Sequence, residues 1–294
     1  MISTVAILWG LLGALCIGAS DCIARVTTQT INSNILFLFI MGTSSFVLLG
    51  AQLLTSNLPP FHAYAWAVSA GSGLLNLLAL YFLYKALARG PVTVASPAAS
   101  TFVVMLVLMN AIAGEPWSFT QLIAVAVVFL GVSQLARHSP AAAEDKPYDA
   151  KWLRWTAIYG LAAAATVTVR FFMAQEAGDV IGPFHALTLN RLFAFIGALC
   201  IAAWQIAKRM QLTLPKGRML RLVLLQTLFE SLALGSFLIG SASASRIGTT
   251  IGFSAFSVIT ALIAWVWLGE AIGKRRAWWM LVVVGGLILG SLQI

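Results

Sequence analysis

Charged residues are scarce in this chain, and their scarcity excludes most classes of soluble protein. Only 9% of the 294 residues are Asp, Glu, Lys or Arg, whereas 60% are hydrophobic. A soluble domain carries about a quarter charged residues, so too little polar chain remains here for a soluble domain, a disordered region or a nucleic-acid-binding surface. The composition is typical of an all-α integral membrane protein, in which each span needs about 20 apolar residues.

Several kinds of chemical site are also missing from the sequence. The three cysteines lie in or at the ends of apolar runs and indicate no disulfide scaffold. The three histidines are dispersed, without the spacing of metal ligands. Because no Gly-x-x-x-x-Gly-Lys-Ser/Thr loop is present, ATP-driven pumping is not expected. We therefore expect no metal, no cofactor and no catalytic residues, and do not expect an enzyme.

The apolar runs predict ten transmembrane helices. They fall at about 4–24, 35–54, 64–86, 92–113, 119–136, 153–174, 184–207, 220–243, 248–268 and 277–293. The longest polar stretch follows the fifth run and indicates a linker at 137–152. We therefore predict two five-helix repeats, 1–136 and 153–294.

The two predicted halves share features at a constant offset of 155 residues. The offset aligns Gly114-Glu115 with Gly269-Glu270, Gly131 with Gly286, and Pro97 with Gly252. Such self-similarity is typical of an internal repeat, although small residues and a loop carboxylate also align by chance in apolar chains. An odd number of helices makes the second copy cross the membrane in the opposite direction. This predicts inverted repeats, which recur in transporters.

Positive charge is unevenly distributed among the predicted loops. Fifteen of the 18 Lys and Arg residues lie after the first, third, fifth, seventh and ninth spans, and only Arg246 lies in a loop on the other side. Cytoplasmic loops are enriched in Lys and Arg. The charge count therefore predicts a multi-pass protein of the cell (inner) membrane with both termini outside.

Two segments at equivalent places in the halves carry short motifs. One is Leu83-Tyr-Lys-Ala-Leu-Ala-Arg-Gly-Pro-Val-Thr-Val-Ala-Ser-Pro97, followed by an apolar helix and Gly114-Glu115-Pro116; the other runs from Ser241-Ala-Ser-Ala-Ser-Arg-Ile-Gly248 to Trp267-Leu-Gly-Glu270. Both resemble the EamA domain of the drug/metabolite transporter superfamily. The resemblance implies a ten-helix secondary carrier whose relatives export amino acids, metabolites and drugs or carry nucleotide sugars. Many relatives place both termini in the cytoplasm, contrary to the charge count here.

Three ionisable residues lie well inside the predicted spans, where charge is costly. At 1.5 Å per residue, Glu230 lies roughly 15 Å from the linker side, and Arg170 and Arg191 lie roughly 26 and 24 Å from it. All three can therefore line one cavity. Glu230 is a candidate proton-coupling carboxylate, and either arginine can dock a substrate carboxylate or phosphate. The alternatives are a static Glu–Arg pair, or arginines that snorkel to the interface.

Two other sets of polar residues also have both a functional and a structural interpretation. Asn76 lies one residue from the repeat equivalent of Glu230, where it can hydrogen-bond substrate or join packed helices. Asp21 and Arg25 are four residues apart and share one helix face. That spacing favours a local surface ion pair over a gate.

Helix-weakening residues recur at equivalent positions of the two halves. Pro97 removes a backbone hydrogen bond, and Gly252, near Gly248, weakens the matching place in the second half. Paired weak points of this kind predict a hinge, although Gly248-x-x-x-Gly252 is also a close-packing pattern. Gly286-x-x-x-Gly290 can likewise pack inside the monomer, which is favoured, or form a homodimer.

Taken together, these features predict a secondary transporter of small metabolites that works by alternating access. Export of an amino acid is favoured, with protons as a candidate coupling ion; the expected partners are a small-molecule substrate and the lipid bilayer, and no nucleic acid. A drug efflux carrier is an alternative, and a channel would be distinguished by its conductance. A membrane-embedded enzyme or lipid-handling protein would instead need clustered His, Asp or Ser at one interface.

Overall fold

The computed structural model of the chain is all-helical throughout the residues that it describes, which are 2–27, 30–89, 98–99, 101–137, 150–208, 214–268 and 273–291. The helices are α1 (Ile2–Thr27), α2 (Ser33–Leu54), α3 (Ala63–Arg89), α5 (Phe102–Ile112), α6 (Phe119–Arg137), α7 (Ala150–Ile181), α8 (Pro183–Ala207), α9 (Arg218–Ser243), α10 (Arg246–Phe253), α11 (Phe256–Leu268) and α12 (Lys274–Ser291).

The lengths and compositions of these helices make the chain a multi-pass membrane protein. Within the described residues, seven helical segments are long and apolar enough to cross a membrane, and α10 with α11 forms one of them. Three shorter apolar helices accompany these seven: Phe102–Ile112, Phe119–Gln134 and Ala277–Gly290. The all-helical membrane class is thus confirmed, whereas the count of ten crossings stays a prediction.

Two predicted spans differ from the helices of the structure. α7 continues to Ile181 instead of ending near residue 174. Its last turns contain Glu176 and Asp179. Because both carboxylates pair with Arg246, their charge is offset and the helix can continue past the predicted end. The predicted span 248–268 is interrupted by a turn at residues 254–255, between α10 and α11.

Some of the predicted features lie outside the described residues. They include Pro97, residues 138–149 of the linker at 137–152, and the pair Gly269-Glu270. The division into domains at these boundaries therefore stays a prediction.

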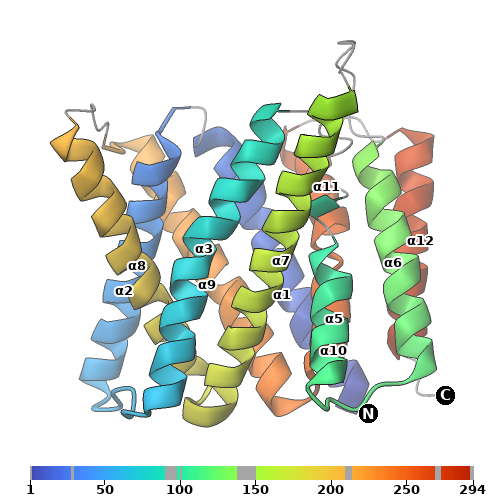
Figure 1. Cartoon of the computed structure of the whole chain (residues 1–294), viewed down its shortest axis with the longest axis horizontal. Helices are drawn as coiled ribbons and strands as arrows, with labels where there is room; N and C mark the ends of the chain where they lie inside the picture. The colour runs from blue at the N-terminus through green and yellow to red at the C-terminus, as the bar shows by residue number, and fades with distance from the viewer. Residues whose placement is uncertain are drawn as a thin grey trace.

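The two ends of the bundle provide a frame for locating the site. α1 begins and α12 ends at the lower edge of Figure 1, which we call the terminal face. α6 ends and α7 begins at the upper edge, which we call the linker face. α1 and α7, the first helices of the two predicted halves, therefore run in opposite directions.

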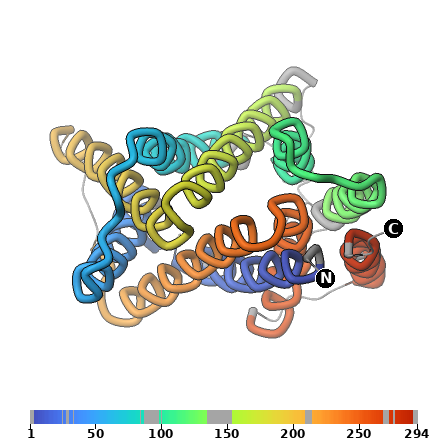
Figure 2. Tube along the Cα trace, turned by 90° about the horizontal axis from the view of Figure 1, so that it is seen from below, coloured from blue at the N-terminus to red at the C-terminus, as the bar shows by residue number. Residues whose placement is uncertain are grey.

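Helices of one half pack mainly on helices of the other. α1 lies against α9 and α3 against α7, while α2 contacts α8 and α6 contacts α12. Seen from below, α3 and α7 form one side of the bundle, and α1 and α9 form the other (Figure 2). Each half thus supplies helices to both sides of the centre.

Glycines allow some of these contacts to become very close. A Cβ atom on Gly252 would lie 2.2 Å from the backbone oxygen of Ile7, so α10 packs directly on the backbone of α1. Gly131 and Gly286 each face a valine of the partner helix where α6 meets α12, and Gly290 faces Ile251. Gly286 and Gly290 therefore pack inside the monomer, as the sequence favoured.

We expect Gly252→Ala to destabilise the protein, because the new methyl group forces α1 and α10 apart. Overpacking of this kind costs about 1–3 kcal/mol. The measurement is thermal unfolding of the purified protein in detergent. Gly285→Ala is the matched control, since a Cβ atom there meets nothing within 4 Å. Equal melting temperatures for the two variants would contradict the close contact.

Candidate functional site

A cavity of about 520 Å³ lies in the bundle between its centre and the linker face. Its lining comes from the second halves of α1 and α3, the first turns of α2, the middle of α7 and α8 and the first two thirds of α9, with single residues from α5, α10 and α11. The volume is typical of small-molecule sites. Its polar and charged lining residues include Asp21, Asn76, Arg170, Arg191, Gln226 and Glu230.

Arg191 of α8 and Glu230 of α9 form a buried ion pair. The Arg191 side chain is 0% exposed, and its Nη1 lies 3.1 Å from Oε1 of Glu230, whose side chain is 20% exposed. Nη2 of Arg191 donates to the backbone oxygen of Glu230 at 2.9 Å, and Nη1 contacts the sulfur of Met41 on α2 at 3.2 Å. Arg191 thereby links α8 to α9 and α2, and Glu230 neutralises its positive charge.

Arg170 of α7 has different surroundings. Arg170 differs from Arg191 in that no salt bridge involves it within the described part of the chain. The buried Nε atoms of both arginines lack a hydrogen-bond partner there. The guanidinium carbon lies 4.7 Å from the ring centroid of Phe171, within cation–π range. Arg170 is therefore the arginine of the cavity that is available to an anionic group.

A short chain of hydrogen bonds fixes the backbone of Arg170. Nδ2 of Asn190 on α8 donates to Oγ of Ser72 on α3 at 2.7 Å. Ser72 in turn donates to the backbone oxygen of Arg170 at 2.8 Å. The position of α7 beside the cavity is thus tied to α3 and α8.

Two amides extend the polar wall. Asn76 of α3 is 6% exposed, and its Nδ2 atom has no partner in the described residues, which leaves a donor at the cavity. Gln226 was not anticipated, although it lies four residues before Glu230 and so shares its helix face. Its Oε1 accepts a hydrogen bond of 3.0 Å from Thr27 of α1.

The surface location predicted for Asp21 requires a correction, because Asp21 lies in the cavity wall. Its predicted ion pair with Arg25 stays a prediction. The Arg25 side chain lies outside the described residues. Helical spacing identifies the shared face of the two residues but not what that face meets, so the sequence could not reveal that α1 turns Asp21 toward Glu230.

The predicted hinge residues of the second half lie in α10. Gly248 and Gly252 are both buried there, against Ala6 and Ile7 of α1. The helix stops just beyond Gly252, where Oγ of Ser254 bonds to the backbone oxygen of Ile251. Close packing therefore accounts for the two glycines, and their role as a hinge stays a prediction.

The lining of the cavity defines what it can bind. Arg191 and Glu230 neutralise each other, while Arg170 comes from α7 and Asp21 from α1, two helices on different sides of the bundle (Figure 2). Phenylalanines such as Phe37 and Phe256 provide apolar lining. No group of three or more His, Cys, Asp or Glu residues that could hold a metal ion occurs among the described residues. The site fits a small molecule with both charged and apolar parts.

We expect the two arginines to differ in their effect on stability. Arg191→Leu leaves Glu230 without its cation, and breaking a buried pair costs about 3–5 kcal/mol. Arg170→Leu removes a charge that no described carboxylate pairs with, so its cost is smaller. Thermal unfolding of the two variants in detergent makes the comparison. Equal losses would show that Arg170 is also a structural residue.

Comparison with known proteins gives the family. The sequence model of the EamA-like transporter family matches residues 4–136 and again 154–292. A solved structure described as "Crystal structure of protein" has 17% sequence identity and a TM-score of 0.78, over 97% of this chain and 95% of that one; this likeness shows a shared fold. No curated protein matches the chain. Because the two tandem matches span nearly all of its length, the chain belongs to the EamA-like transporter family of the drug/metabolite transporter superfamily.

Proposed function

We propose that the protein is a secondary transporter that exports an amino acid or a similar zwitterionic metabolite by alternating access. The observation that carries the proposal is the charge balance of the cavity. Arg170 offers a guanidinium without a described ion-pair partner, and Asp21 offers a carboxylate from another helix. A zwitterion complements both charges, and family membership supports a small-molecule substrate.

The proposed binding mode assigns a role to each part of the wall. The substrate carboxylate binds the guanidinium of Arg170, which suits the planar fork of donors. The substrate ammonium binds Asp21, and Nδ2 of Asn76 donates a further hydrogen bond. The apolar part of the substrate packs on the phenylalanines. In this mode Arg191 does not touch the substrate, because its Nη1 and Nη2 atoms already donate to Glu230.

Glu230 is proposed to couple transport to protons. Its carboxylate is in the cavity wall and partly exposed, so a proton can reach it. Arg191 keeps its bond to the backbone oxygen of Glu230 whatever the charge of the side chain. Protonation therefore changes the charge of the cavity without releasing Arg191 from α9.

The proposed cycle uses two inverted five-helix repeats that cross the membrane ten times. The opposite directions of α1 and α7 support this, as does the reciprocal packing of α1 on α9 and α3 on α7. The interruption at residues 254–255 supports a hinge at the end of α10. From the loop charges, we place the termini outside the cell (inner) membrane and the cavity toward the cytoplasm.

We expect reconstituted protein to catalyse counterflow of a labelled amino acid. Liposomes are loaded with a mixed pool of unlabelled amino acids, and entry of each labelled one is measured. Arg170→Gln should abolish the counterflow, because the substrate carboxylate loses its cation. Arg154→Gln is the matched control, since Arg154 is exposed on the same helix. The absence of counterflow with every amino acid, together with counterflow of an organic cation, would favour the alternative of drug efflux.

Glu230→Gln should leave the protein folded but remove the effect of a pH gradient on transport. The amide oxygen still accepts from Arg191, whereas the side chain no longer binds or releases a proton. The measurement is the same uptake with and without an imposed pH gradient, alongside counterflow without one. Unchanged gradient dependence in the variant would refute coupling through Glu230.

A further inference from the structure

A second group of charged residues lies at the terminal face, outside the cavity. Arg246, the first residue of α10, pairs with two carboxylates of α7: its Nη1 lies 2.6 Å from Oε1 of Glu176, and its Nη2 contacts Asp179. The hydroxyl of Tyr64 on α3 donates to Oε2 of Glu176 at 3.0 Å. The backbone N–H of Arg246 donates to Oε1 of Glu115, in the α5–α6 connection, at 2.9 Å.

This network joins segments from both halves of the chain at the terminal face. Tyr64 and Glu115 belong to the first half, and the three charged partners belong to the second. Along α7, Glu176 and Asp179 lie roughly 9 and 14 Å beyond Arg170, toward the terminal face. The network therefore lies on the opposite side of the membrane from the linker face, toward which the cavity extends.

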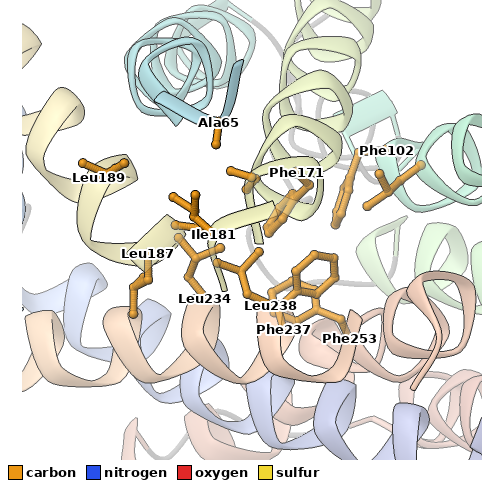
Figure 3. Packing of buried hydrophobic residues seen from close by; sticks show 14 of the residues in the cluster. Ala65, Phe102, Phe171, Ile181, Leu187, Leu189, Leu234, Phe237, Leu238 and Phe253 are labelled. Atoms are coloured by element: carbon orange, nitrogen blue, oxygen red, sulfur yellow. The ribbon is translucent and has the colours of Figure 1, made fainter. Parts of the chain in front are cut away.

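A cluster of phenylalanines separates the cavity from this network. Phe171 of α7 meets Phe237 of α9 at a centroid distance of 4.7 Å, and Phe253 of α10 lies 5.2 Å from Phe237 and 5.6 Å from Phe171 (Figure 3). Beyond the rings, Nε2 of Gln175 donates to Oγ of Ser241 at 3.0 Å. A substrate leaving toward the terminal face must pass the rings, this bond and the Arg246 network.

We propose that Arg246, Glu176, Asp179 and Tyr64 form a gate that closes the terminal face, and that it opens when the ion pairs of Arg246 break. The side chains of Arg246, Glu176 and Asp179 are 12%, 25% and 39% exposed, so water can replace the partners when the helices part. The arginine of the cavity pair, Arg191, is 0% exposed and lacks this property. Arg246 also begins an eight-residue helix that ends at a turn, so α10 can pivot with Arg246 at its moving end.

The test measures how fast single cysteines react on the two sides of the phenylalanines. The native cysteines, Cys16, Cys22 and Cys200, are first replaced by alanine. Ser241→Cys then reports on the route behind the gate, and Leu83→Cys reports on the cavity near the linker face. Each protein is placed in nanodiscs, where both faces are accessible, and is labelled with a cationic methanethiosulfonate reagent.

We expect labelling at Ser241→Cys to accelerate by about tenfold in the Arg246→Gln background, because the substitution removes both partly exposed ion pairs of Arg246. Labelling at Leu83→Cys should slow, because opening one face closes the other. Arg218→Gln is the matched control: Arg218 is exposed and is the first residue of α9, as Arg246 is of α10. It should alter neither rate.

Two results would overturn the proposal. Unchanged rates at both cysteines would show that Arg246 does not hold the face closed. Faster labelling at both cysteines would show that Arg246 only stabilises the fold. Should Arg246→Gln fail to fold, Glu176→Gln, which keeps the Asp179 pair, decides by the same two rates. The inference rests on the proposed transport cycle, but the labelling needs no substrate, so failure of the gate and failure of counterflow are distinguishable.

Discussion

The cost of placing charge in an apolar surrounding governs the organisation of this protein. Arg191 is fully buried, and a guanidinium in that position must find a counter-ion and acceptors close by. Glu230 supplies a carboxylate and a backbone oxygen, which fixes α8 against α9, while Met41 adds a contact with α2. The pairing also determines which charges are left for a ligand, because it occupies one of the two cavity arginines.

The ion pairs of the described residues accordingly lie in two places separated by apolar side chains. One is the cavity toward the linker face, and the other is the Arg246 network at the terminal face. Phe171, Phe237 and Phe253 pack between them. Helices from both halves meet at each place. In the proposed cycle, relative movement of the halves changes both places together, which links the binding of a ligand to the closure of the opposite face.

Much of the candidate site could be predicted from the sequence because charge inside an apolar run is rare and easily seen. The depth of each residue along its helix correctly predicted that Glu230, Arg170 and Arg191 can line one cavity. The repeat offset pointed to Asn76, which lines the same cavity. The same reasoning could not choose which arginine pairs with Glu230. Depth gives a level in the membrane, whereas pairing depends on the rotation of each helix about its axis.

By itself, the sequence determined the all-helical membrane class, the family and the set of buried charges, because hydrophobicity, length and short motifs are properties of local chain. Only the tertiary structure decided that Asp21 lies in the cavity wall, that α7 continues through Glu176 and Asp179, and that the apolar run after Arg246 divides into two helices. Each depends on a partner distant in sequence. Such a partner neutralises a charge or completes a packing contact, and the local composition does not identify that partner.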